Sequence, residues 1–186
     1  GETAESSETG INEADLLRMR EVGKTTLYGF KVFGLDMGTT CHLVVGVTDG
    51  NGRLNVVELH AIRYTDLEYE LPRLVARHNP TAIVADSMPY TETIHRLQQN
   101  FNNLYGSVYV SSKNMEAFRV IDREEDKGRS LLDLRQVNVN RNFALNILMD
   151  DIRSGKIGVV GTDDVVTFEA HLQDMKRQGS TRSAFD

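Results

Sequence analysis

The sequence has one cysteine, no tryptophan and no long hydrophobic run. Its single cysteine, Cys41, excludes an internal disulfide and a cysteine-rich zinc site, and a lone thiol fits a reducing compartment. No apolar run approaches the roughly 20 residues that a membrane-spanning helix needs. No signal peptide is visible either. We therefore expect no membrane partner.

The 186 residues are enough for one domain of ordinary size with a hydrophobic core. An apolar fraction of 40% and a charged fraction of 26% are typical of a globular protein. The chain begins with Gly1 rather than methionine, which favours a fragment of a longer protein. Residues 1–24 are predicted to be a flexible linker or N-terminal extension, and helical spacing over 11–20 favours either a short docking helix or the end of a linker. Residues 179–186 are predicted to be a flexible tail.

The formal net charge of −6 counts against nucleic acid as a partner. The acids are unevenly spread, however, because residues 2–21 carry six and residues 122–126 carry four. Carboxylates that bind metal also lower the formal charge, which the metal then restores. Basic residues gather near the middle and the end of the chain, at Arg119, Arg123, Lys127, Arg129, Lys176 and Arg177. The charge therefore predicts weak, salt-sensitive binding to duplex DNA.

The stretch from Phe30 to Asp49 reads as two strands joined by a tight turn that contains Gly38. The first apolar run ends in a single acid, Asp36. A carboxylate at the end of a buried strand is costly unless something pairs with it, and a divalent cation is the usual partner. Gly38 would let a phosphate or a metal approach the backbone closely. The alternative interpretation is that Asp36 only caps the turn.

The rest of the chain alternates strand and helix patterns. The run over 81–86 is fully apolar and ends, again, in a single acid, Asp86, as a central strand covered on both faces would. The order of elements indicates a ribonuclease H-like α/β fold: a mixed sheet with an antiparallel meander and parallel strands, flanked by helices. The expected elements are strands at 54–64, 81–86, 107–111 and 157–160, and helices at 67–78, 91–103, 142–153 and from 165 to about 175. The domain is predicted to span residues 25–178.

Residues 119–137 form a charged segment with poor periodicity, called here the arm. Two interpretations stand about equal. The arm is either a mobile segment beside the carboxylates that restricts entry to them, or a β-hairpin that extends the sheet.

Asp36 and Asp86 both follow strands that are neighbours in the ribonuclease H-like plan, so their carboxylates should converge. A third acid must come from the C-terminal helix, and Asp174 is the best candidate, with His171 one turn away on the same face. Asp163 or Asp164 could be the third ligand instead. Oxygen-rich sites of this kind select Mg²⁺ or Mn²⁺, and two ions about 4 Å apart can hydrolyse a phosphodiester. The remaining histidines carry no spacing signal and are interpreted as structural: His42, His60, His78 and His95.

Three segments, GLDMGTT, IVADSMP and FEAHLQDMKRQ, together resemble the nuclease domain of phage terminase large subunits. The resemblance implies a ribonuclease H-like endonuclease with two Mg²⁺ or Mn²⁺ ions on Asp36, Asp86 and Asp174, and His171 among the catalytic residues. It implies cutting of concatemeric viral double-stranded DNA during genome packaging, in the host cytoplasm. The implied partners are an upstream ATPase domain, the portal and the small terminase subunit. No Walker A motif is present here, so the chain would be the nuclease half, expected to be monomeric by itself.

Other classes of protein share parts of this pattern. A RuvC-type junction resolvase, or a related ribonuclease H-like nuclease, uses the same carboxylate plan. The segment Leu35 to Thr40 also resembles the phosphate-binding turn of actin and heat-shock chaperone ATPases, although a second glycine-rich phosphate loop is missing. A ribonuclease H-like interaction module without activity is a further alternative, which the presence of three acids at the expected places disfavours.

Overall fold

The computed structural model describes residues 11–111, 118–120 and 135–160. Within these ranges lie eight strands, four α-helices and one short 3-10 turn. In chain order the elements are α2 (Glu13–Gly23), β1 (Phe30–Asp36), β2 (Thr40–Thr48), β3 (Leu54–Arg63), η1 (Tyr64–Asp66), α3 (Leu67–His78), β4 (Ala82–Asp86), α4 (Thr91–Asn100), β5 (Leu104–Val110), β6 (Phe118–Val120), β7 (Gln136–Asn140), α5 (Arg141–Arg153) and β8 (Ile157–Val159).

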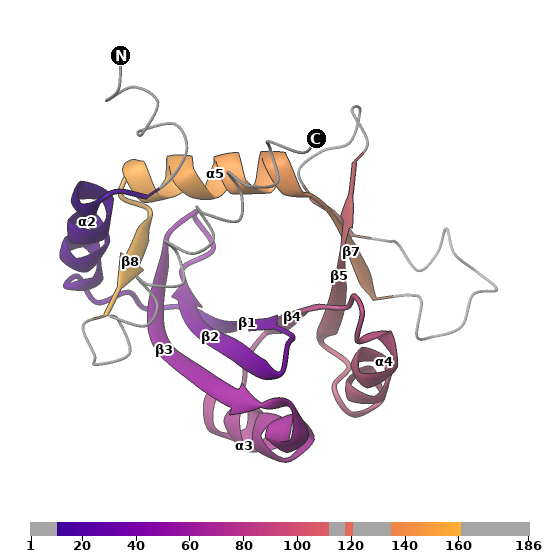
Figure 1. Ribbon diagram of the computed structural model, residues 1–186. Helices are drawn as coiled ribbons and strands as arrows, with labels where there is room; N and C mark the ends of the chain where they lie inside the picture. The colour runs from indigo at the N-terminus through magenta and orange to yellow at the C-terminus, as the bar shows by residue number, and fades with distance from the viewer. Residues whose placement is uncertain (1–10, 112–117, 121–134, 161–186) are drawn as a thin grey trace.

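The strands form one mixed sheet in the order β6-β7-β5-β4-β1-β2-β3-β8 (Figure 1). The first three strands are an antiparallel meander. β4 runs parallel to β1 on the side away from β2, and β5 runs parallel to β4. This central order, β3-β2-β1-β4-β5, is the ribonuclease H-like plan, so the predicted fold class is confirmed. β7 and β6 extend the sheet at one edge, and β8 extends it at the other.

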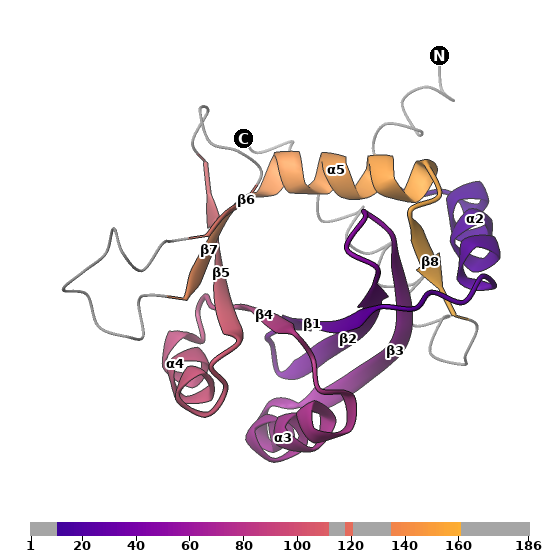
Figure 2. The same cartoon turned by 180° about the vertical axis from the view of Figure 1, so that it is seen from behind.

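Helices lie on both sides of this sheet (Figures 1 and 2). α3 and α4 pack on one side, called here the α3–α4 face, whereas α5 crosses the opposite side, the α5 face. Because strand side chains alternate between faces, every second residue of β1, β2 and β4 points toward α3 and α4. The buried strand residues that do so include Phe33, Leu35, Leu43, Val45, Ile83 and Ala85. Leu67, Leu71 and Ile94 from the two helices complete this main core.

A second, smaller core joins α2 to the β3–β8 edge of the sheet. Asn12 caps α2 through a reciprocal pair of hydrogen bonds: its side chain accepts from the Asp15 backbone at 2.9 Å, and Asp15 accepts from the Asn12 backbone at 3.1 Å. Leu16 and Met19 of the helix are buried against Ile152 of α5 and Val159 of β8. For these residues the docking-helix interpretation agrees with the structure. The predicted domain boundary at residue 24 and the tail at 179–186 stay predictions.

Two elements differ from their predicted bounds by three residues at one end. α4 ends at Asn100 rather than 103, because its C-cap Phe101 has an extended backbone. β5 begins at Leu104 rather than Ser107, and Leu104 pairs with Ile83 in the core. The pattern Leu-Tyr-Gly at 104–106 lacks polar alternation because this strand lies inside the sheet, between β4 and β7. A period-2 pattern therefore could not mark its start.

The two ends of the arm are strands. β6 pairs antiparallel with β7, with Phe118 opposite Val139, which agrees with the hairpin interpretation at these ends. Buried Arg135 fastens the start of β7 to the end of α4, because its guanidinium donates to the backbone carbonyls of Gln98 and Phe101. The middle of the arm, residues 121–134, lies outside the described residues. Among the described helices none is long and apolar enough to cross a membrane.

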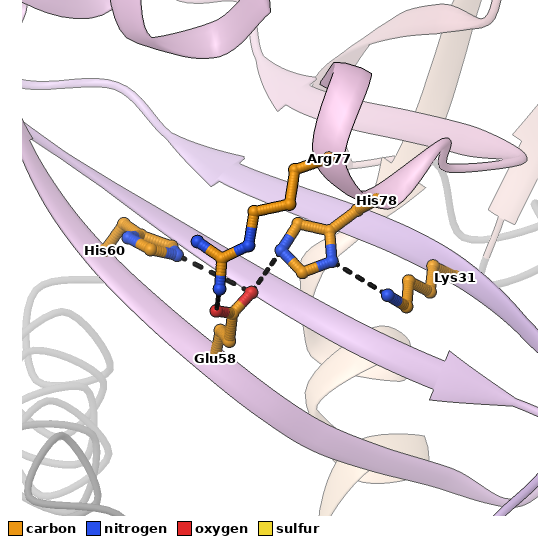
Figure 3. A network of polar contacts seen from close by, with 5 residues as sticks. All are labelled: Lys31, Glu58, His60, Arg77 and His78. Atoms are coloured by element: carbon orange, nitrogen blue, oxygen red, sulfur yellow. Dashed lines mark hydrogen bonds and ion pairs between the residues drawn. The ribbon is translucent and has the colours of Figure 1, made fainter. Parts of the chain in front are cut away.

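A polar network fastens the end of α3 to the sheet (Figure 3). The carboxylate of Glu58, on β3, contacts both Arg77 and His78 at the last turn of α3, and lies 3.8 Å from His60. The Lys31 ammonium of β1 lies 2.9 Å from Nδ1 of His78. Burial lowers the pKa of His78 below its usual 6.5, Lys31 and Arg77 lower it further, and Glu58 opposes them. His60 and His78 thus have structural contacts, as expected for both.

Candidate functional site

The structure brings Asp36 and Asp86 together at one edge of the sheet. β1 and β4 are parallel neighbours, and their paired register ends at Leu35 and Ala85. Asp36 and Asp86 are the next residue on each strand, and both strands end there. Neighbouring parallel strands in register place equivalent side chains on the same face, so the two carboxylates lie side by side. The predicted convergence of these two acids agrees with this geometry.

The electrostatics of Asp86 show the effect of this neighbour. Asp86 is half-buried, and this burial raises the pKa of its carboxyl above the usual 3.8. The charge of Asp36 raises the pKa of Asp86 as well, whereas a hydrogen bond from the Met88 backbone lowers it. Asp36 itself is exposed. A cation bound between two neighbouring carboxylates would remove the repulsion between their charges.

Strand alternation places both acids on the α5 face. Leu35 and Ala85 point into the core, so Asp36 and Asp86, one residue on, point to the other side. Two residues before them on the same face are Gly34, which is exposed, and Val84, which is 38% exposed. A Cβ atom built at Gly34 would meet no heavy atom of the described residues within 4 Å. The described part of the chain therefore leaves the α5 face open beside the acids.

The registers of the neighbouring strands align a row of side chains with the two acids. His42 of β2 pairs with Asp36 in the antiparallel ladder. Ser107 of β5 pairs with Asp86 in the parallel ladder. On the α5 face, four side chains therefore form a row across β2, β1, β4 and β5: His42, Asp36, Asp86 and Ser107. Sequence reasoning missed the last position and interpreted His42 as structural, although the odd-even alternation of Cys41, His42 and Leu43 could have placed it on the polar face.

The backbone after Asp86 is held by β5. The Ser87 hydroxyl donates to the Ser107 carbonyl at 2.8 Å, and the Ser87 backbone donates to the same oxygen at 3.1 Å. The Ser107 hydroxyl donates to the Ala85 carbonyl at 3.3 Å. These bonds fix the end of β4 against β5, which keeps the Asp86 carboxylate in place. The following Met88–Pro89 peptide bond is cis.

The turn after Asp36 is tight, and Gly38 serves the turn itself. A Cβ at Gly38 would lie 3.1 Å from the Thr40 carbonyl oxygen, closer than nine in ten real Cβ contacts. The Cys41 thiol lies 3.6 Å from the Gly38 carbonyl, and the Thr39 carbonyl accepts from the Tyr64 backbone at 3.0 Å. The close chain reversal thus explains the glycine without a ligand.

The predicted third ligand comes from the C-terminal part of the chain. Asp174 and His171, and the alternates Asp163 and Asp164, lie outside the described residues. In the part of the chain that the structure describes, no group of three His, Cys, Asp or Glu side chains could hold a metal ion. The described part of the site is therefore a pair of carboxylates on an open face. Oxygen donors of this type fit a hard divalent cation such as Mg²⁺ or Mn²⁺.

Comparison with protein-family models and with curated proteins finds no match. Among solved structures, the chain is similar to the yeast mitochondrial Holliday junction resolvase Ydc2, with a TM-score of 0.40 and 12% identity over 87% of this chain and 78% of that one. It is also similar to the RuvC of T. thermophilus in complex with a Holliday junction substrate, with a TM-score of 0.30 and 12% identity over 71% and 63% of the two chains.

A third similar structure is the large terminase of bacteriophage HK97, with a TM-score of 0.33 and 16% identity. That match covers 80% of this chain and 33% of the terminase. At such identities the likeness concerns the fold alone. The class of protein is thus defined by the topology of its own sheet, which is ribonuclease H-like.

Proposed function

We propose that this protein is a metal-dependent endonuclease that hydrolyses phosphodiester bonds in DNA. The observation that carries the proposal is the position of Asp36 and Asp86, side by side at the ends of two parallel strands and on the open face of the sheet. Ligand sites in open α/β sheets lie at the carboxyl ends of strands. The raised pKa of Asp86 adds a second reason, since perturbed acids cluster at functional sites.

The residues of the chain would have the following roles in this reaction. Asp36 and Asp86 would hold the cations, and Asp174 and His171 are proposed to complete the ligand and catalytic set. Bound Mg²⁺ or Mn²⁺ would supply an activated water and stabilise the leaving oxygen. The hydrogen bonds between Ser87 and Ser107 keep Asp86 fixed during the reaction. The open α5 face beside Gly34 would leave the two acids accessible to a substrate.

The finer proposal follows the resemblance of the sequence motifs. The substrate is concatemeric viral double-stranded DNA, cut during genome packaging in the host cytoplasm. The partners are an upstream ATPase domain, the portal and the small terminase subunit, and the nuclease by itself is a monomer. The net charge of −6 supports weak binding of the isolated chain to DNA, so that most of the hold on DNA would come from the partners.

A plasmid-cleavage assay tests the proposal. The protein is incubated with supercoiled plasmid in Mg²⁺, in Mn²⁺ and in EDTA, and nicked and linear products are measured. We expect cleavage with either metal and none with EDTA. A linear duplex and a four-way junction are then compared, because preferential cutting of the junction would favour a resolvase over a terminase. No cleavage of any DNA, together with binding of ATP, would favour the nucleotide-binding alternative.

A further inference from the structure

Two aromatic side chains lie on the α5 face beyond the acids. Ser107 of β5 pairs with Asp86, so Tyr109, two residues further along β5, points to the same face. Tyr109 pairs with Val139 of β7, which in turn pairs with Phe118 of β6. Paired residues of neighbouring strands share a face of the sheet. Tyr109 and Phe118 therefore lie on the same face as the two carboxylates.

Both aromatic side chains are exposed. Tyr109 is 59% exposed and Phe118 is 50% exposed, whereas Val139 on the strand between them is 8% exposed. A ring kept for packing is covered by its neighbours, as Phe33 of the main core is at 2% exposure. Exposed apolar side chains that gather at one place are typical of a binding surface. The two rings thus offer such a surface on either side of buried Val139.

A cation lies next to the Tyr109 ring. α5 begins at Arg141, directly after β7, and the guanidinium carbon of Arg141 is 5.8 Å from the centroid of the Tyr109 ring. A positive charge at a helix N-terminus opposes the helix dipole, and no acid in the first turn of α5 offsets it. This position favours a role for Arg141 outside helix stability. An aromatic face beside a positive charge is the combination that binds single-stranded nucleic acid.

The position of Tyr109 relative to the acids allows one strand of nucleic acid to contact both. Residues rise about 3.3 Å each along a strand, and neighbouring strands lie about 4.8 Å apart. The backbone of Tyr109 therefore lies roughly 8 Å from that of Asp86. A phosphate at the acids would place the base of an adjacent nucleotide within reach of the ring. In a paired duplex that base is stacked inside the helix, so only an unpaired base could reach Tyr109.

We propose that Tyr109 stacks on an unpaired base of the strand that is cut, next to the phosphate at Asp36 and Asp86. The inference rests on the proposed nuclease function and adds the class of DNA that the site prefers: duplex with unpaired bases beside the cleaved bond. Phe118 would contact the same nucleotide through its apolar ring, and Arg141 through its charge. Every base has a π face, so the preference would be for structure and not for sequence.

The test compares substitutions at Tyr109 with a matched control. Tyr109→Leu removes the ring. Because Tyr109 also makes a further interaction, Tyr109→Phe separates the ring, which it keeps, from the hydroxyl. Tyr109→Thr, whose side chain favours strands, is measured in parallel, so that a folding defect of one variant does not decide the result. The control is Tyr69→Leu, because Tyr69 of α3 is 67% exposed and has the Arg73 guanidinium 5.5 Å from its ring, on the other side of the sheet.

The measurement is the dissociation constant in Ca²⁺ for two fluorescent DNAs of the same sequence. One is a fully paired duplex, and the other has a short single-stranded gap. Cleavage of both DNAs in Mn²⁺ is measured alongside. Sedimentation velocity gives the oligomeric state of each protein, and thermal melting checks that each variant folds.

We expect the wild type to bind the gapped duplex more tightly than the paired one. Tyr109→Leu and Tyr109→Thr should lose about 5- to 150-fold in affinity for the gapped duplex, the range for one base stacked on an aromatic ring, with little change for the paired duplex. Tyr109→Phe and Tyr69→Leu should match the wild type.

Two results in binding would overturn the inference while leaving the nuclease proposal intact: equal affinity of the wild type for both DNAs, or a wild-type gap preference in Tyr109→Leu and Tyr109→Thr. A wild-type dimer that Tyr109→Leu converts to a monomer would also overturn it, because the rings would then belong to an interface between copies. A wild-type protein that neither binds nor cuts any DNA would overturn both proposals.

Discussion

On the α3–α4 face of β1 and β4, four side chains are at most 4% exposed: Phe33, Leu35, Ile83 and Ala85. On the α5 face of the same strands, Gly34 is exposed and Val84 is 38% exposed. Among the described residues, α5 does not cover this face of β1 and β4, since its own Phe143 and Ile147 are 48% and 42% exposed. One face of the sheet thus holds the core, and the other presents the acids.

The comparison teaches why the acids are tolerated at strand ends. The acids end β1 and β4, and these strands pack against α3 and α4 on the opposite face. Repulsion between the two carboxylates therefore does not separate the strands. Burial, and to a lesser extent the charge of Asp36, raise the pKa of Asp86. Stability and the proposed function should therefore be separable by face, and substitutions on the two faces should have different effects.

The largest expected effect concerns activity and arises on the α5 face. Asp36→Asn or Asp86→Asn should reduce plasmid cleavage to the level seen in EDTA, because an amide is a poor ligand for Mg²⁺ or Mn²⁺ compared with a carboxylate. Neither variant should unfold, since each removes one charge from a repelling pair. The measurement is cleavage rate alongside the melting temperature. Full activity in either variant would end the assignment of that acid.

The next effect concerns stability and arises on the α3–α4 face. Ile83→Ala should lower the free energy of unfolding by about 2 to 5 kcal/mol, because it leaves a cavity in the main core. Val84→Ala, one residue further along β4, should lower it by less than about 1 kcal/mol, since Val84 is partly exposed. Urea unfolding of both variants measures the difference. Equal losses would show that the α5 face is packed as tightly as the other.

A smaller expected effect is the pH dependence of the free energy of unfolding, which differs between groups on the two faces. The pKa of His78 is lowered in the folded state, so the unfolded chain binds a proton more readily below pH 6.5. The contribution of His78 to stability should be complete above 6.5 and should be lost as the pH falls through the folded pKa. Urea unfolding between pH 7.5 and 5 measures it, with His78→Gln as the comparison. If both proteins lose stability equally over this range, His78 is not the group responsible.

The smallest expected effect is the pH dependence of stability due to Asp86, which has the opposite sign to that due to His78. The pKa of Asp86 is raised in the folded state, so the folded chain binds a proton more readily at pH values above 3.8. In EDTA, protonation of Asp86 should stabilise the protein as the pH falls through the folded pKa, and Asp86→Asn should lack this gain. The difference in unfolding free energy between wild type and Asp86→Asn, followed from pH 7 downward, tests it. A difference that stays constant with pH would contradict the raised pKa.

The sequence allowed the strand order and the two acids to be predicted because their signals are local. An apolar run that ends in Asp36 or Asp86 is visible without knowing what lies beside it. The row with His42 and Ser107 depends on register, which is set by pairing between distant strands and by the packing of α3 and α4. For the same reason the start of β5 at Leu104 was predicted three residues too late. The third ligand, Asp174, stays a prediction.

Calorimetric titration with Mn²⁺ tests the central claim most directly, because it asks whether the acids on the open face hold a cation, with no substrate involved. Wild type, Asp36→Asn and Asp86→Asn are compared with the control Asp49→Asn, at a turn where the Asp49 side chain accepts from the Asn51 backbone at 2.8 Å. We expect wild type and Asp49→Asn to bind Mn²⁺ equally, and both site variants to lose at least one bound ion. Equal binding by all four proteins would contradict the account.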